Sequence, residues 1–149
     1  MNRIVHACCL LLLLLLAGSC ASTKHPEQWQ PADVRSSSER ILSEVTRLTL
    51  DKNNFPGGTG LDPTTLSMVS GWNISLAPFR GKGFRERCHI RFQRLKDGNY
   101  KVEVRVERQR NDDILRPLDL TYAQWEEDPD NIERSRVVLQ YLRSLLAQQ

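Results

Sequence analysis

Five basic side chains that recur at alternating positions in two neighbouring segments are the residues best placed to bind an anionic partner. They are Arg87, His89, Arg91, Lys101 and Arg105. Because successive residues of a strand point to opposite faces, these odd-numbered positions are expected to share one face. Such a face would attract anionic lipid headgroups, another polyanion or an acidic protein. The alternative is a solvated face that is neutralised by Glu103, Glu107 and the acidic segment that follows.

The residues that could support catalysis or metal binding form no recognisable motif. Cys88 and His89 are adjacent, which places them on opposite faces of a strand and disfavours a nucleophile and base pair. Cys88 is expected to be a small buried hydrophobe. Asp112, Asp113 and the acidic run 126–128 lack the spacing of a calcium loop, and the histidines lack zinc-ligand spacing. We predict no metal, no cofactor and no catalytic residue, and favour a non-enzymatic protein over a hydrolase whose carboxylates meet only in the fold.

Nucleic acid is not an expected partner. Proteins that bind single strands stack the bases on aromatic side chains that lie among basic residues. Phe92 and Tyr100 fall on the even-numbered, apolar side of the same segments, away from the basic positions. The predicted basic face therefore lacks a stacking platform.

The first twenty residues have the features of an export signal. Arg3 precedes an apolar run from Ala7 to Ala17, and the small residues Gly18 and Ser19 lead directly to Cys20. The run is about 11 residues long, whereas a helix needs roughly 20 apolar residues to cross a bilayer. We therefore expect the leader to be removed rather than to remain as a membrane span.

The junction Leu16-Ala17-Gly18-Ser19-Cys20 resembles the lipobox of bacterial lipoproteins. The resemblance implies that residues 1–19 are a signal peptide and that Cys20 becomes the mature N-terminus, carrying palmitate or another acyl chain that holds the protein to a membrane. Ala21 follows in place of Asp, which under the Gram-negative sorting rule implies the outer membrane, facing the periplasm. The alternative is cleavage by ordinary signal peptidase and release as a secreted protein.

A tether and one domain are expected after the leader. Residues 20–35 are polar and contain Pro26 and Pro31 without a helical or strand period, so we predict a lipid-anchored tether. Residues 36–149 are enough for a single compact domain.

Two amphipathic helices are predicted at the ends of this domain. Ser36 and Glu39 form a capping box for a helix that continues to about Lys52. Asp128 and the following proline open a second helix that reaches about Ala147. Between them, residues 66–76 suggest a strand interrupted at Ser70-Gly71, and residues 114–122 suggest an edge strand.

A hairpin over about residues 86–108 is the best specified element. Apolar and charged residues alternate in both halves, and Lys96-Asp97-Gly98 lies between them. A loop there with Gly98 in the left-handed conformation sets the pairing register. The predicted pairs are Phe92 with Val102, Ile90 with Val104, Cys88 with Val106, Arg91 with Glu103, and Arg87 with Glu107.

Charge is segregated along the domain, although the chain as a whole is nearly neutral. Residues 80–110 contain eleven Lys and Arg against four Asp and Glu, whereas residues 111–133 contain eight acids against Arg116. The elements together predict an α+β fold, in which an antiparallel sheet of three or four strands is flanked by an N-terminal and a C-terminal helix. The function they favour is a non-catalytic binding or assembly module of the bacterial cell envelope.

Overall fold

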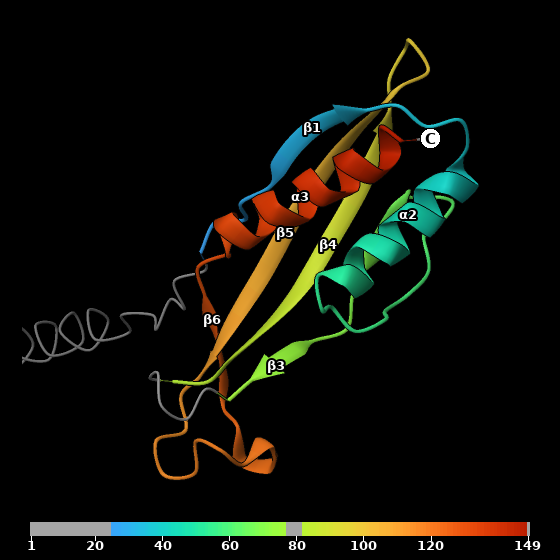
Figure 1. The fold of residues 1–149 in the computed structure, drawn as a ribbon. Coiled ribbons are helices and arrows are strands. Elements are labelled where there is room, and N and C mark those ends of the chain that lie inside the picture. Colours follow the sequence, from blue (N-terminus) through green and yellow to red (C-terminus); the bar gives the residue numbers. More distant parts are fainter. Residues whose placement is uncertain (1–24, 77–81, 149) are drawn as a thin grey trace, which may run out of the picture.

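A long hairpin forms the middle of a six-stranded antiparallel sheet in the computed structural model (Figure 1). The structure describes residues 25–76 and 82–148, so the predicted signal peptide and Cys20 lie outside the described residues. The α+β class is confirmed, but the sheet is larger than the three or four strands predicted. Its strands are β1 (Gln30–Val34), β2 (Ser67–Val69), β3 (Asn73–Ser75), β4 (Phe84–Arg94), β5 (Tyr100–Asn111) and β6 (Trp125–Asp128).

Each outer edge of the β4–β5 hairpin is lined by two short strands. β1 and β6 pair with β5, whereas β2 and β3 pair with β4, and all four pairings are antiparallel. The hairpin has the predicted register, including Ile90 opposite Val104 and Arg87 opposite Glu107. Gly98 in its turn has a φ of 80°, the left-handed conformation that glycine adopts without steric cost. Local alternation was therefore enough to specify the centre of the sheet.

Two helices, α2 (Glu39–Lys52) and α3 (Ile132–Leu146), cover one face of the sheet (Figure 1). The even-numbered residues from Glu86 to Phe92 and from Tyr100 to Val106 are buried beneath them, and Val102, Val104 and Val106 are 0% exposed. Within the described part of the chain, no helix is both long and apolar enough to span a bilayer. Among residues 25–76 and 82–148, no helix covers the opposite face of the sheet, which we call the helix-free face.

Both helices begin later than predicted. Ser38 caps α2 by accepting a hydrogen bond from the Ile41 N–H, and Asn131 caps α3 in the same way through the Arg134 N–H. The predicted caps, Ser36 and Asp128, lie outside the helices; Asp128 is instead the last residue of β6.

Two segments differ from their predicted structure, and a third agrees with it. The predicted tether is wrong for residues 30–34, which form β1, because a five-residue edge strand with a proline has little periodicity of its own. The predicted strand over residues 114–122 is a loop that ends in a 3₁₀ helix (Leu120–Tyr122), and the strand comes later as β6. The interruption at Ser70-Gly71 is confirmed, since it separates β2 from β3.

The start of α3 closes the outer edge of β5 between β1 and β6. The Val106 N–H donates to Ser135 Oγ over 2.9 Å, and the Val106 carbonyl accepts from the Asn131 N–H over 2.9 Å. Two polar atoms of the helix start thus replace the partner strand that is missing there. This arrangement places the preceding residue, Asp130, beside the helix-free face of the sheet.

Candidate functional site

All five predicted basic residues lie on the helix-free face. Arg87, His89 and Arg91 come from β4, and Lys101 and Arg105 come from β5. They alternate with the buried residues of the hairpin, so the face opposite the helices carries their side chains. The structure therefore brings together the residues that the alternation grouped.

Carboxylates pair with these basic side chains across the two strands. Arg91 Nε lies 2.6 Å from one Glu103 oxygen, and Lys101 Nζ lies 3.0 Å from the other. Arg87 Nε donates to Glu107 Oε2 over 2.6 Å, and His89 Nε2 lies 2.8 Å from the same oxygen.

Glu107 is held as an anion by this pairing. Burial by itself raises the pKa of the Glu107 carboxyl, but the hydrogen bonds from His89 and Arg87, together with the Arg87 charge, lower it to about 2. The predicted neutralisation by Glu103 and Glu107 is therefore present on this face.

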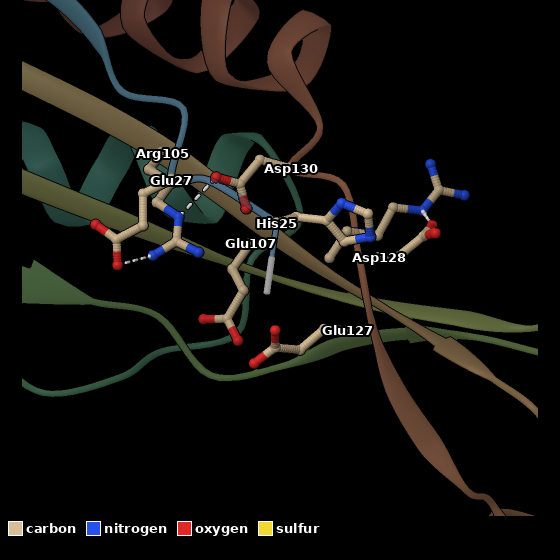
Figure 2. A pocket seen from close by; sticks show the side chains of 8 residues that line it. His25, Glu27, Arg105, Glu107, Glu127, Asp128 and Asp130 are labelled. Carbon is tan, nitrogen blue, oxygen red and sulfur yellow. Dashed lines mark hydrogen bonds and ion pairs between the residues drawn. The ribbon is translucent and has the colours of Figure 1, made fainter. Parts of the chain in front are cut away.

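Arg105 is paired with two carboxylates from other segments (Figure 2). Its Nε donates to Asp130 Oδ2 over 2.7 Å, and its Nη1 lies 2.7 Å from Glu27 Oε1. Burial lowers the pKa of Arg105, but the Asp130 hydrogen bond and the surrounding negative charges outweigh it and raise the pKa overall. Asp130 also accepts the Gln28 N–H over 2.8 Å, which fastens the segment before β1 to the edge of the sheet.

All three tryptophans of the chain stack on arginines of this face, and each is half-buried. The Arg91 guanidinium carbon lies 3.9 Å from the centre of the Trp29 ring, and that of Arg87 lies 4.6 Å from the centre of Trp72. Trp29 also donates its indole N–H to Glu27 over 2.9 Å. The expected absence of aromatic residues from this face is therefore wrong, and we name the surface formed by these groups the Trp–Arg face.

The tryptophans escaped prediction because each comes from a segment outside the hairpin. Trp29 precedes β1, Trp72 precedes β3 and Trp125 opens β6. Trp72 also lies at an even position within residues 66–76, as the buried Met68 does. The break at Ser70-Gly71 separates it from the buried Met68, and Trp72 stacks on the helix-free side.

Arg85 is the arginine of the Trp–Arg face that stacks on two tryptophans. Its guanidinium carbon lies 4.4 Å from the centre of the Trp72 ring and 4.8 Å from that of Trp125. Its Nε donates to Gln109 Oε1 over 2.7 Å. Burial and the nearby Arg87 charge lower the pKa of Arg85. Among residues 25–76 and 82–148, no carboxylate forms an ion pair with this side chain, in contrast to its neighbours.

A pocket of about 130 Å³ adjoins this face where the segment before β1 meets the start of α3 (Figure 2). Carboxylates predominate in its lining, which consists of His25, Glu27, Arg105, Glu107, Arg108, Glu127, Asp128 and Asp130. The fold thus brings acidic residues together, as a hydrolase would require.

The chemistry of the pocket is that of an ion-pair cluster. The Trp29 hydrogen bond and the Arg105 charge lower the pKa of Glu27, and the pKa of Glu107 is lowered as described above. A general acid needs the opposite shift, so that it holds a proton near neutral pH. In the part of the chain that the structure describes, no three His, Cys, Asp or Glu side chains are arranged to hold a metal ion.

Cys88 and His89 are separated as expected. Cys88 is 0% exposed beneath the helices, and burial raises the pKa of its thiol. The His89 ring lies on the other face, edge-on to Trp29 with ring centres 6.3 Å apart. A buried thiol with a raised pKa is a poor nucleophile, so the structure disfavours thiol catalysis at this position.

No family model, no curated protein and no solved structure matches the chain.

Proposed function

We propose that this chain is a lipid-anchored, non-catalytic binding module of the bacterial cell envelope, and that the Trp–Arg face binds its partner. The observation that carries the proposal is the stacking of all three tryptophans on arginines over a sheet face without a helix. Tryptophan and arginine are enriched among the residues that dominate binding energy at protein interfaces.

The stacked arrangement suits binding because the side chains are already ordered. Arg87 and Arg91 are each fixed by a tryptophan on one side and a glutamate on the other. Ordering such long side chains on association costs about 0.5–1.5 kcal/mol each. On this face the side chains are already ordered in the unbound protein, so binding does not have to order them. An envelope protein that presents complementary polar and aromatic groups is the partner we favour.

The proposed anchor would hold this face close to the membrane. Glu27 and Trp29 contact the sheet, so the chain is fastened to the domain from about residue 27 onwards. Glu27 comes seven positions after Cys20, so the chain between them spans at most about 25 Å when fully extended. Lipidation of Cys20 would therefore place the domain within reach of partners at the inner surface of the outer membrane.

Two measurements test this function separately. Intact-mass spectrometry of protein purified from bacterial membranes should find a chain that begins at Cys20 with added acyl mass, and Cys20→Ala should lose both the mass and membrane retention. An unacylated, soluble form that begins elsewhere would remove the anchor and favour a secreted protein.

Chemical crosslinking in the envelope, followed by binding assays with the identified partner, tests the face. Trp72→Ala and Arg91→Ala should weaken binding, whereas Val137→Ala, on the outer side of α3, should leave it unchanged. Circular dichroism would confirm that each variant stays folded. Equal binding by all three variants would contradict the use of this face.

A second candidate, favoured by Arg85, is binding of a polyanion or lipid headgroup. Its guanidinium is held between two indoles and has no carboxylate partner in the described residues, so its terminal nitrogens are free to bind a carboxylate or phosphate. We place it second because Arg87, Arg91 and Arg105 are already paired. Affinity for anionic vesicles that falls steeply with salt and is lost in Arg85→Gln would favour this candidate over a protein partner.

A further inference from the structure

The loop between β5 and β6 gathers most of the exposed apolar side chains in the described residues. Eight large hydrophobic residues are exposed in the described part of the chain, and five of them lie within residues 114–122 of this loop. This segment, which we call the apolar loop, lies at the end of the hairpin opposite the Gly98 turn (Figure 1). Its exposed residues are Ile114 (78% exposed), Leu115 (84%), Leu118 (55%), Leu120 (52%) and Tyr122 (45%).

The base of the apolar loop is fixed by a buried asparagine. Asn111 is only 1% exposed, and its Oδ1 accepts the N–H groups of Asp113 (3.1 Å) and Gln124 (3.0 Å) on the two arms of the loop. The Asp112 N–H also donates to the Gln124 carbonyl over 2.8 Å. The two arms are therefore joined by the kind of buried polar hub that specifies a single backbone conformation.

The part of the loop from Asp113 to Tyr122 is held in place by hydrogen bonds and a stacking contact of its own side chains. Asp113 Oδ1 accepts the N–H groups of Leu115 (2.9 Å) and Arg116 (2.7 Å). Asp119 caps the 3₁₀ helix through the Thr121 N–H over 2.9 Å. The guanidinium carbon of Arg116 lies 3.2 Å from the centre of the Tyr122 ring. The leucines are thus presented to solvent on a preorganised support, which lowers the entropic cost of docking.

The charge around the apolar loop distinguishes between its possible binding partners: a lipid surface, a second copy of the loop or another protein. The segment from Asp112 to Glu127 carries five acidic residues against Arg116, whose guanidinium is stacked on Tyr122. Segments that bind anionic membranes carry lysine and arginine around their apolar residues, so this loop has the wrong sign for a lipid surface. A symmetric pair of loops would bring the same acidic residues together. The favoured occupant is a different protein that offers an apolar groove with a basic rim.

We propose that the apolar loop docks into an apolar groove rimmed by lysine and arginine on another envelope protein, as an anchor separate from the Trp–Arg face. Leu115 and Leu118 fill the groove, and the acidic residues beside them meet its rim. Apolar anchors at the centre of an interface carry most of the binding energy, and complementary charges add rate and specificity.

A photo-crosslinking residue placed in the full-length protein in its bacterial host tests the proposal. We expect position 118 to give one discrete protein adduct in intact cells, and position 137 to give none. Val137 is a matched control because it is 56% exposed, against 55% for Leu118, and lies on α3 outside the loop.

Binding to the purified adduct partner then tests the chemistry. Leu115→Ser and Leu118→Ser should each weaken binding about tenfold or more, and Val137→Ser should have no effect. Wild-type binding should weaken as the salt concentration rises. Two further readouts use the Cys20→Ala full chain: flotation with phosphatidylethanolamine–phosphatidylglycerol vesicles, and sedimentation of the protein alone. Vesicle binding or self-association that depends on Leu118, or the absence of a loop-dependent adduct, would overturn the proposal.

Discussion

Replacing Glu107 by glutamine tests whether the centre of the Trp–Arg face is held together by charge. The Glu107 side chain is 15% exposed and contacts both Arg87 and His89. Glutamine keeps the size and much of the hydrogen-bonding capacity of the side chain but removes its negative charge. The variant therefore isolates the electrostatic part of the interaction.

The magnitude follows from the pKa of this carboxyl. A fall from the ordinary value of 4.5 to about 2 on folding corresponds to roughly 3 kcal/mol of stability at neutral pH. Because the folded-state pKa is the lower one, this contribution is complete above about pH 5 and is lost as the pH falls towards 2. The stability difference between the wild type and Glu107→Gln should shrink to about half at pH 3.

Urea denaturation at pH 7, 5 and 3 measures this difference directly. Glu103→Gln is the matched control, because its partner Arg91 has a side chain that is 46% exposed. Solvent screening should limit the loss in this control to less than about 1 kcal/mol. A difference for Glu107→Gln that stays constant between pH 7 and pH 3 would refute the reasoning, since a lost charge interaction must titrate with the carboxyl that makes it.

Three other substitutions or probes have defined outcomes. Gly58→Ala should destabilise the protein by about 2–3 kcal/mol in urea denaturation, because a Cβ there would lie 1.8 Å from the carbonyl oxygen at the end of β2, whereas Gly57→Ala, with nothing within 4 Å, should have little effect. Ser135→Ala should cost about 1–3 kcal/mol in the same assay, because the buried Val106 N–H loses its acceptor. The Cys88 thiol should react with Ellman's reagent only after denaturant is added, and rapid reaction of the native protein would contradict its burial.

The hairpin and the two helices were predictable because each is defined by a pattern within its own residues. Alternation from Cys88 to Phe92 and from Val102 to Val106 has a period of two that only one register satisfies, and the observed pairs are the predicted ones. The short strands β1 and β6 have five and four residues. Strands of this length acquire their identity from pairing with β5, which no local pattern records.

The candidate site was predictable only in part, for the same reason. Arg87 and Arg91 could be placed on one face from their spacing, but nothing near them in the chain indicates that Trp29 and Trp72 cover them. The sequence of residues 114–122 suggests an edge strand, whereas the structure places these apolar residues in an exposed loop. Their exposure is a property of the fold, and the sequence pattern alone does not distinguish a core segment from a docking segment.

Each edge of the sheet is divided between two short strands, and this division limits pairing with the strands of other chains. β4 and β5 have 11 and 12 residues, and a bare edge of that length, about 35–40 Å, would template the strands of other chains. Here the outward-facing edges belong to strands of three to five residues, and Pro31 removes a backbone donor from β1. The sheet therefore offers only short edges to the strands of other chains, which limits fibrous self-assembly through its longest strands.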